Sequence, residues 1–258
     1  MAFERDEALL LEVIDLQDSD RIVAFLSRQH GQKRGVAKGA RRPHSRFAGQ
    51  LQPLAKARID WREKEGRDLV RISDVDVLRP VDLSGDLEGL LVGSYLADHL
   101  LEFVQENEPG DLWFRLLDST VEALLDGVDR DLAARYFETW VLRLSGIFPE
   151  PRECPQCGRG LASEGVVLPP DGDSFVCRRC SDRGLRIAPE VLEFVIRSGR
   201  RALGALAKEP PSRDTLRLVE QICAQIRRQF LQRELRSYEV IQQTLGAGRA
   251  FGRFDGAR

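Results

Sequence analysis

The sequence lacks the residue patterns from which enzyme active sites are usually built. It contains no GxxxxGK[ST] phosphate loop, no GxGxxG turn, no HExxH pair and no GxSxG nucleophile motif. Only three histidines occur, and none is followed two positions later by glutamate, as a zinc deaminase would require. We therefore expect a protein that binds its partners without catalysing a reaction, and we assign no catalytic residue.

The sequence also lacks an apolar run of the length, about 18 residues, that a membrane-spanning helix needs. Its first residues, MAFERDE, are acidic and lack the basic and apolar regions of a secretory signal. We therefore expect a cytoplasmic protein whose cysteines are kept reduced. With 258 residues, of which 42% are hydrophobic, the chain has enough apolar material for one large or several small folded domains.

Acidic residues are absent from one long stretch, although the net charge of the whole chain is only −2. Residues 21–59 carry ten Lys and Arg without any acid, whereas residues 60–150 sum to −12 and residues 197–258 to +7. Such a stretch is typical of a surface that binds nucleic acid, the alternative being a solvated face on which cations cluster by chance. The side chains predicted to contact phosphate are Lys33, Arg34, Lys38, Arg41, Arg42 and Arg46. We expect the acidic residues 60–150 to face away from this surface.

Glycine and aromatic residues refine the prediction for this surface. Gly35 and Gly39 are expected to let the backbone approach a phosphate closely. The nearby large rings are few, namely Phe25, Phe47 and Trp61, which favours tracking of the nucleic-acid backbone over stacking of bases. A second set of basic residues is a candidate for contacts with DNA or with an acidic peptide: Arg197, Arg200, Arg201, Arg227 and Arg228.

Short apolar segments between turn residues predict a small β-barrel in residues 1–80. The segments expected to form strands are residues 8–16, 21–26, 33–38, 51–61 and 67–78. Five short strands suit an OB-fold, but periodicity alone does not distinguish an OB-fold from an SH3-like barrel.

Apolar residues at helical spacing predict an all-helical domain after the barrel, which gives an α+β protein. Residues 81–150 form its first part and residues 188–245 its second part. Helices are expected near residues 87–104, 111–127, 132–144, 189–206 and 214–237. Residues 246–258, rich in Gly, Arg and Phe, are predicted to be a disordered tail.

Four of the five cysteines lie in an insert, residues 151–187, that has little apolar periodicity. Cys154 and Cys157 form one C-x2-C pair and Cys177 and Cys180 a second, 19 residues further on. This spacing is typical of a four-cysteine zinc site, whose four thiolates leave no open coordination position. Two disulfides or free thiols are the alternatives, and both fit poorly with a reducing compartment and a segment without a core. We predict one structural zinc ion per chain, with the fifth cysteine, Cys223, in the helical core.

A set of short motifs in the basic stretch resembles a known family. The motifs are DRIVAFLS at residues 20–27, QHG at 29–31, VAKGARRP at 36–43, SR at 45–46 and LQP at 51–53. Together with the downstream cysteines they resemble the RecO family of bacterial recombination mediators. The resemblance covers essentially the whole chain, with one departure: the first predicted strand is followed by an acidic loop where the family often has aromatic and basic residues.

The resemblance implies an N-terminal OB-fold and a helical domain that holds the zinc site. It also implies binding of single- and double-stranded DNA, annealing of complementary strands and a place near the nucleoid. The partners it implies are RecR and the acidic tail of single-strand binding protein, with RecA loaded at gaps and breaks.

Two other readings remain open from the residues alone. An OB-fold protein that binds RNA and carries a structural zinc ribbon would show the same barrel and basic stretch. An enzyme with a zinc ribbon, such as a nuclease or a tRNA-modifying enzyme, would need clustered carboxylates or a nucleotide loop, and neither is present in the sequence.

Overall fold

The computed structural model describes residues 2–66, 68–83, 85–106, 108–161, 165–171 and 173–245. The chain forms two compact units, Met1–Val121 and Glu122–Arg258. The tail that the sequence predicts to be disordered lies outside the described residues. Within the described residues, no helix combines the length and the apolar character needed to span a membrane.

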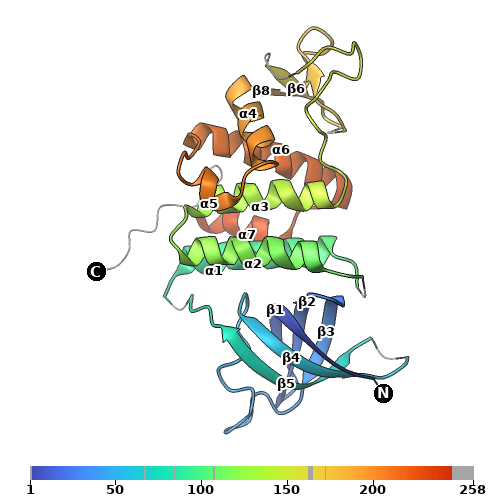
Figure 1. Cartoon of the computed structure of the whole chain (residues 1–258), viewed down its shortest axis with the longest axis vertical. Helices are drawn as coiled ribbons and strands as arrows, with labels where there is room; N and C mark the ends of the chain where they lie inside the picture. Colours follow the sequence, from blue (N-terminus) through green and yellow to red (C-terminus); the bar gives the residue numbers. More distant parts are fainter. Residues whose placement is uncertain are drawn as a thin grey trace. The chain divides into compact units, whose positions relative to one another are not determined.

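The first unit contains a closed β-barrel of five strands (Figure 1). The strands are β1 (Ala2–Leu16), β2 (Asp20–Ser27), β3 (Gly31–Ala37), β4 (Lys56–Glu63) and β5 (Val70–Arg79). The strands follow the order β1-β2-β3-β5-β4, and pairing of β4 with β1 closes the barrel. Strands β3 and β5 pair in parallel, and all other neighbouring strands are antiparallel. This Greek-key order fits the OB-fold. The prediction of a small barrel is therefore confirmed, and the strand order favours an OB-fold over an SH3-like barrel.

Strand β1 begins six residues earlier than the sequence predicts, at Ala2 rather than Ala8, because it pairs with two partners. Its first part, Ala2–Leu9, pairs with β4, and its second part, from Ala8 on, pairs with β2. The register shifts between Leu10 and Glu12, and a β-bulge of this kind bends a strand so that it can turn a barrel corner. The first part escaped prediction because its residues, FERDE, are mostly charged and carry little apolar signal.

The inside of the barrel is filled by side chains that alternate with outward-facing polar ones along each strand. The innermost side chains include Phe25, Phe47 and Trp61, whose exposed fractions are 0, 1 and 0%. The rings of Phe25 and Trp61 pack at a centroid distance of 5.4 Å. All three aromatic residues near the basic stretch are therefore core residues.

Gly35 of β3 also faces this core. A Cβ at this position would lie 2.8 Å from Ile72 Cγ1 and 2.8 Å from Val70 Cγ2, both on the parallel neighbour β5. Gly35 is buried, so its role is close packing of β3 against β5. The prediction that Gly35 lets the backbone approach a phosphate is wrong.

Two helices complete the first unit, α1 (Leu87–Phe103) and the start of α2 (Asp111–Leu125). Asp86 caps α1 by accepting a hydrogen bond from the Gly89 N–H. Ion pairs join α2 to the barrel: Arg28 Nε lies 2.7 Å from Asp111, and Asp118 binds both Lys56 and Arg79. Acidic residues of α2 thus neutralise cations of the barrel.

The second unit contains helices and a small three-stranded sheet. The helices are α3 (Arg130–Leu144), α4 (Pro189–Ser198), α5 (Leu203–Leu206), α6 (Arg213–Leu231) and α7 (Arg236–Leu245), and the sheet consists of β6 (Val166–Leu168), β7 (Val176–Cys177) and β8 (Leu185–Ile187). The two longest helices predicted in this region are each divided in two. The second break falls at Gln232, which caps α6 in the left-handed conformation.

Charged residues are buried between α3 and α6. The Arg135 guanidinium, 2% exposed, lies 2.6 Å from Glu138 and 3.1 Å from Glu220. Burial raises the pKa of the nearby Asp131 carboxyl, while Arg135 acts in the opposite sense. Cys223 is fully buried in the same region, as predicted, and burial raises the pKa of its thiol to about 12.

The packing of Gly35 gives a first prediction. Gly35→Ala should destabilise the barrel by about 1–3 kcal/mol, because the added methyl group has no room between Val70 and Ile72. Urea denaturation followed by intrinsic fluorescence would measure the change. Gly204→Ala serves as the control, because a Cβ there meets nothing within 4 Å and should leave stability unchanged or slightly higher. Equal stability of Gly35→Ala and wild type would contradict the packing argument.

Candidate nucleic-acid interface and metal centre

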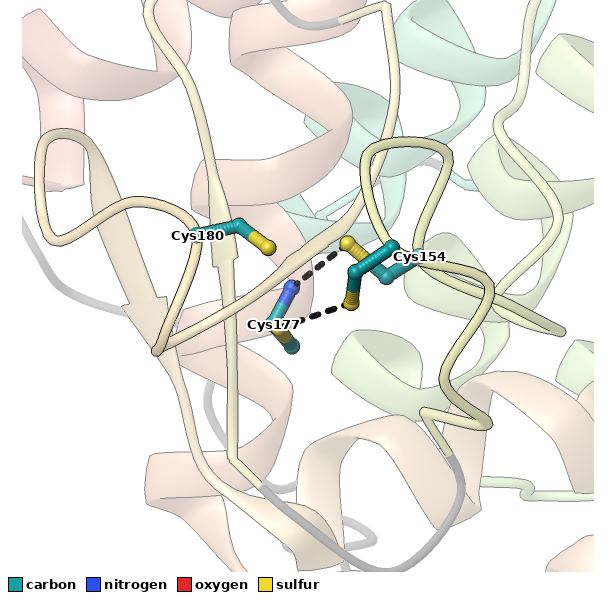
Figure 2. Close-up of side chains that lie close together, drawn as sticks. Cys154, Cys177 and Cys180 are labelled. Atoms are coloured by element: carbon teal, nitrogen blue, oxygen red, sulfur yellow. Dashed lines mark hydrogen bonds between the residues drawn. The ribbon is translucent and has the colours of Figure 1, made fainter.

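Four cysteines come together in the second unit although 19 residues separate the two pairs in sequence. Their Sγ atoms all lie within 4.8 Å of one another. The Cys177 N–H donates to Cys154 Sγ at 3.4 Å, and the Sγ atoms of Cys157 and Cys177 are 3.7 Å apart. Figure 2 shows Cys154, Cys177 and Cys180 close together, with the sulfur atoms of Cys154 and Cys180 directed into the space between the three side chains.

Each C-x2-C pair forms the same kind of tight turn. The Cys154 carbonyl accepts from the N–H groups of Cys157 and Gly158, and the Cys177 carbonyl accepts from those of Cys180 and Ser181. Gly158 has a φ of +70°, which glycine adopts without the steric cost that a side chain would bring. The two turns are therefore set by local sequence, and the hydrogen bond from the Cys177 N–H to Cys154 Sγ joins one turn to the other.

The geometry of the cluster fits a tetrahedral metal ion. Thiolates about 2.3 Å from a central zinc would stand roughly 3.8 Å apart, close to the 3.7 Å between Cys157 and Cys177. A disulfide needs a separation of about 2 Å, so these cysteines are free thiols that could hold a metal ion. The fifth cysteine, Cys223, lies outside the cluster.

The thiols of the cluster have different acidities. Burial opposes ionisation of Cys154, but hydrogen bonds from the backbone N–H groups of Cys177 and of its own turn outweigh it and lower the pKa to about 6. Hydrogen bonds with Cys157 and Cys177 raise the pKa of Cys180 to about 12. Without a cation the crowded thiols do not all ionise together, and a bound metal would supply the charge that lets them do so.

The basic side chains predicted to contact phosphate differ in their surroundings. Lys33 is a correction to the prediction: its Nζ lies 2.6 Å from Glu63 Oε1, and its side chain is only 9% exposed. The hydrogen bond from Lys33 lowers the pKa of Glu63. Lys33, Gly35 and Ala37 share the inner face of β3 because side chains alternate along a strand, so Lys33 stabilises the barrel and does not face solvent.

Four of the remaining predicted residues have no carboxylate within ion-pair distance among the described residues: Arg34, Lys38, Arg42 and Arg46. The Arg46 guanidinium lies 5.0 Å from the centre of the Phe47 ring, which orients it without neutralising it. Arg41 differs from these four. Its Nε is 3.4 Å from Asp15, and its Nη1 donates to the Gln17 carbonyl at 3.0 Å.

The loop that carries most of these side chains, residues 38–46, is called the basic loop below. The turn between β1 and β2 holds it: Asp20 Oδ1 accepts from the Gly39 N–H at 2.8 Å, and the Ser19 carbonyl accepts from the Arg41 N–H at 3.0 Å. The bond from Gly39 lowers the pKa of Asp20. The acidic turn that departs from the RecO pattern is therefore a support for the basic loop.

The expectation that the acidic residues 60–150 face away from the basic stretch is wrong in part. Glu63, Asp76, Asp111 and Asp118 each form an ion pair with a cation of residues 21–59. The stretch therefore presents less positive charge than its sequence total of ten cations implies.

The second basic set, in the second unit, is also partly neutralised. Arg197 and Arg201 share Glu209, at 3.1 and 3.4 Å, and Arg228 lies 3.7 Å from Glu234. Arg227 is a second correction: it is 1% exposed, lies 2.6 Å from Glu234, and stacks on the Tyr238 ring at 4.8 Å. It connects α6 to α7 and does not face a ligand. Arg200 is exposed and has no ion pair in the described part of the chain.

Sequence reasoning did not select Arg62 and Arg71. Both are exposed, and they stand directly opposite each other on β4 and β5. Because they fall in the acidic part of the sequence, counting charge by segment hides them. The hairpin turn at residues 64–66 was the signal that could have paired them.

The cysteine cluster gives a prediction about metal content. The wild-type chain should contain one bound metal ion, and Cys154→Ser should lose it and unfold the residues around β6–β8, since this small sheet has little core of its own. Elemental analysis and protease sensitivity would measure both effects. Cys223→Ala is the matched control and should keep the metal. A metal-free wild-type protein with an intact fold would contradict the prediction.

The hydrogen bond from the Gly39 N–H to Asp20 gives a prediction in which two variants with the same charge are compared. Asp20→Ala and Asp20→Asn remove the same charge, but only asparagine keeps an oxygen that can accept the Gly39 N–H. Hydrogen exchange at Gly39 and Arg41 should be faster in Asp20→Ala than in wild type, and close to wild type in Asp20→Asn. Equal exchange in both variants would show that the hydrogen bond does not hold the loop.

Comparison with known proteins agrees with this architecture. The family model "Recombination protein O N terminal" matches residues 1–81, and "Recombination protein O C terminal" matches residues 84–239. The DNA repair protein RecO of Anaeromyxobacter sp. (strain K) is 32% identical over 206 residues, 78% of this chain and 81% of that protein. The DNA repair protein RecO of Geobacter metallireducens is 30% identical over 215 residues, 82% of this chain and 87% of that protein. The matches cover both the barrel and the cysteine-bearing helical part, and the chain belongs to the RecO family.

Proposed function

We propose that this protein is a DNA repair and recombination mediator whose barrel binds single- and double-stranded DNA. The observation that carries the proposal is a group of cations on one OB-fold barrel that have no carboxylate within ion-pair distance among the described residues: Arg34, Lys38, Arg42 and Arg46. Arg41 joins them if a phosphate displaces Asp15. Lys33 leaves the predicted set because it is buried.

The proposed interaction is mainly electrostatic. Cations that contact phosphates release condensed counterions, so affinity should fall steeply with salt. Five contacts on a single strand correspond to a log–log salt slope of roughly −3.5. A binder that holds the phosphates leaves the base edges free, which suits the annealing of complementary strands.

The wider role rests on the family and on charge. We propose that the protein works with RecR, receives the acidic tail of single-strand binding protein and so helps RecA to load on coated DNA. In the second unit, Arg200 and Arg201 are the proposed contacts for an acidic tail, because both are exposed and Arg201 shares its single carboxylate with Arg197. The proposed work is binding and annealing, and it needs no catalytic residue.

We propose that the metal held by the four cysteines is zinc and that its role is structural. Four thiolates complete a tetrahedron and leave no position for water or substrate. Zinc would then hold together two turns that are distant in sequence, and it would support β6–β8 in place of a hydrophobic core.

A charge-neutralised basic loop tests the DNA-binding proposal. The triple variant Lys38→Gln/Arg42→Gln/Arg46→Gln should weaken binding of single-stranded DNA by more than tenfold at moderate salt, and the salt slope should become shallower by roughly two. Fluorescence anisotropy across a salt series would measure both quantities.

The matched control removes the same charge from the same stretch. Arg21→Gln/Arg28→Gln/Arg58→Gln takes away three cations that already have carboxylate partners, so it should change affinity far less. Equal losses in the two triple variants would show that net charge alone matters and would refute the assignment of the basic loop. Stronger binding to RNA than to DNA, with no annealing of complementary DNA strands, would favour the RNA-binding alternative.

A further inference from the structure

The register of the barrel places five outward-facing side chains in one row that crosses all five strands. Phe3 on β1 is opposite Arg62 on β4, and Arg62 is opposite Arg71 on β5. Arg71 is opposite Val36 on β3, and Val36 is opposite Ile22 on β2. Neighbouring strands are about 4.8 Å apart, so these side chains form a continuous band, called the outer row below.

The outer row contains positive charge that the fold does not compensate. Like charges directly opposite each other in an antiparallel pair destabilise a sheet. Arg62 and Arg71 are such a pair, both are exposed, and neither forms an ion pair among the described residues.

The cations at neighbouring outward positions, unlike Arg62 and Arg71, form ion pairs. Arg5 lies 2.6 Å from Asp60, and Arg58 lies 3.6 Å from Asp76, so both cations are paired across strands. The same sheet therefore compensates its cations next to the outer row and leaves them uncompensated within it. An anionic partner would turn this unfavourable pair into a favourable one.

An exposed aromatic ring stands beside the two arginines. Phe3 is 54% exposed and is opposite Arg62. Among the described residues of the first unit, Phe3 is the only Phe, Tyr or Trp classed as exposed, because the other barrel rings lie in the core. A ring next to cations on an outer barrel surface is the combination that holds single strands, with phosphates on the cations and a base on the ring.

The outer row is also continuous with the basic loop. Arg34 lies two positions before Val36 on β3, and Lys38 lies two positions after it, directly beyond the end of the strand. Side chains two positions apart on a strand point the same way, so Arg34 faces outward like Val36. Cations without carboxylate partners thus extend from Arg62 through Arg71 to the basic loop. This continuity, together with the spacing of single cations along a band, favours a nucleic-acid strand over an acidic peptide.

We propose that the outer row is a second contact surface of the barrel, specific for single-stranded DNA. Arg62 and Arg71 bind phosphates, and Phe3 stacks on one unpaired base. The proposal rests on the proposed DNA binding by the barrel and deepens it, because the ring can stack only on a base that is not enclosed in a duplex. The outer row then distinguishes single strands from duplexes, whereas the cations of the basic loop serve both.

Two exposed arginines on the same face of β4 provide a matched test. Arg62→Gln should weaken binding of single-stranded DNA about three- to tenfold at low salt and make the salt slope shallower by roughly 0.7. Arg58→Gln, which removes an equal but paired charge from the same strand, should stay within about twofold of wild type. Arg62→Gln should also melt no lower than wild type, because it relieves a like-charge contact.

Phe3 is tested with single-stranded and duplex DNA side by side. Phe3→Leu keeps an apolar side chain but removes the ring, and it should weaken single-strand binding at least about fivefold while leaving duplex binding unchanged. In Phe3→Trp, the added single strand should quench the new tryptophan, and affinity should be kept. Equal losses for both DNA forms, or no quenching, would overturn the role of the ring.

The outcomes separate this inference from the proposed function. If the basic-loop variant loses affinity but Arg62→Gln and Phe3→Leu behave like Arg58→Gln, the outer row is not a DNA contact and the proposed function stands. If the wild-type protein does not bind DNA at all, the proposed function itself fails. If an acidic peptide binds wild type but not Arg62→Gln, while DNA binding is equal in the two, the row is a peptide surface and the inference is overturned.

Discussion

Ion pairing between the basic stretch and carboxylates from elsewhere in the chain determines which cations of the first unit are already neutralised within the fold. The ion pair of Lys33 with Glu63 joins β3 to β4 and neutralises the buried ammonium group of Lys33. The ion pair of Lys56 with Asp118 joins the barrel to α2. The cations that remain after this internal neutralisation form the candidate DNA surface. The charge left without a carboxylate partner is therefore smaller than the sequence total, and it lies mainly on the basic loop and the outer row.

Sequence reasoning was reliable where the signal was local. The cysteine pairs fold into turns of four or five residues, so their spacing alone predicted the cluster that the structure shows. The five strands and the main helices were placed for the same reason, because alternation and helical spacing repeat within a few residues. The short charged beginning of β1 carried no such signal, and its pairing with β4 depends on residues more than 50 positions away.

Long-range pairing explains what could not be predicted. Lys33 and Glu63 are 30 residues apart, and nothing near Lys33 in sequence shows that a carboxylate will cover it inside the barrel. Arg227 and Glu234 lie on opposite sides of the end of α6, where the left-handed Gln232 redirects the chain. Charge counted by segment locates the basic stretch in the sequence. It could not show which cations form ion pairs within the fold. It also could not show that Arg62 and Arg71, both in the acidic part of the sequence, stand opposite each other on β4 and β5.

The bulged strand β1 also has a consequence for biosynthesis. Its first half is made before every other strand, yet its partner β4 ends at residue 63 and is itself covered by β5, which ends at residue 79. During translation, β1 therefore exposes an unpaired edge until β4, which ends at residue 63, has left the ribosome. The charged side chains of its FERDE segment protect that edge, since charged side chains discourage pairing with strands of other nascent chains.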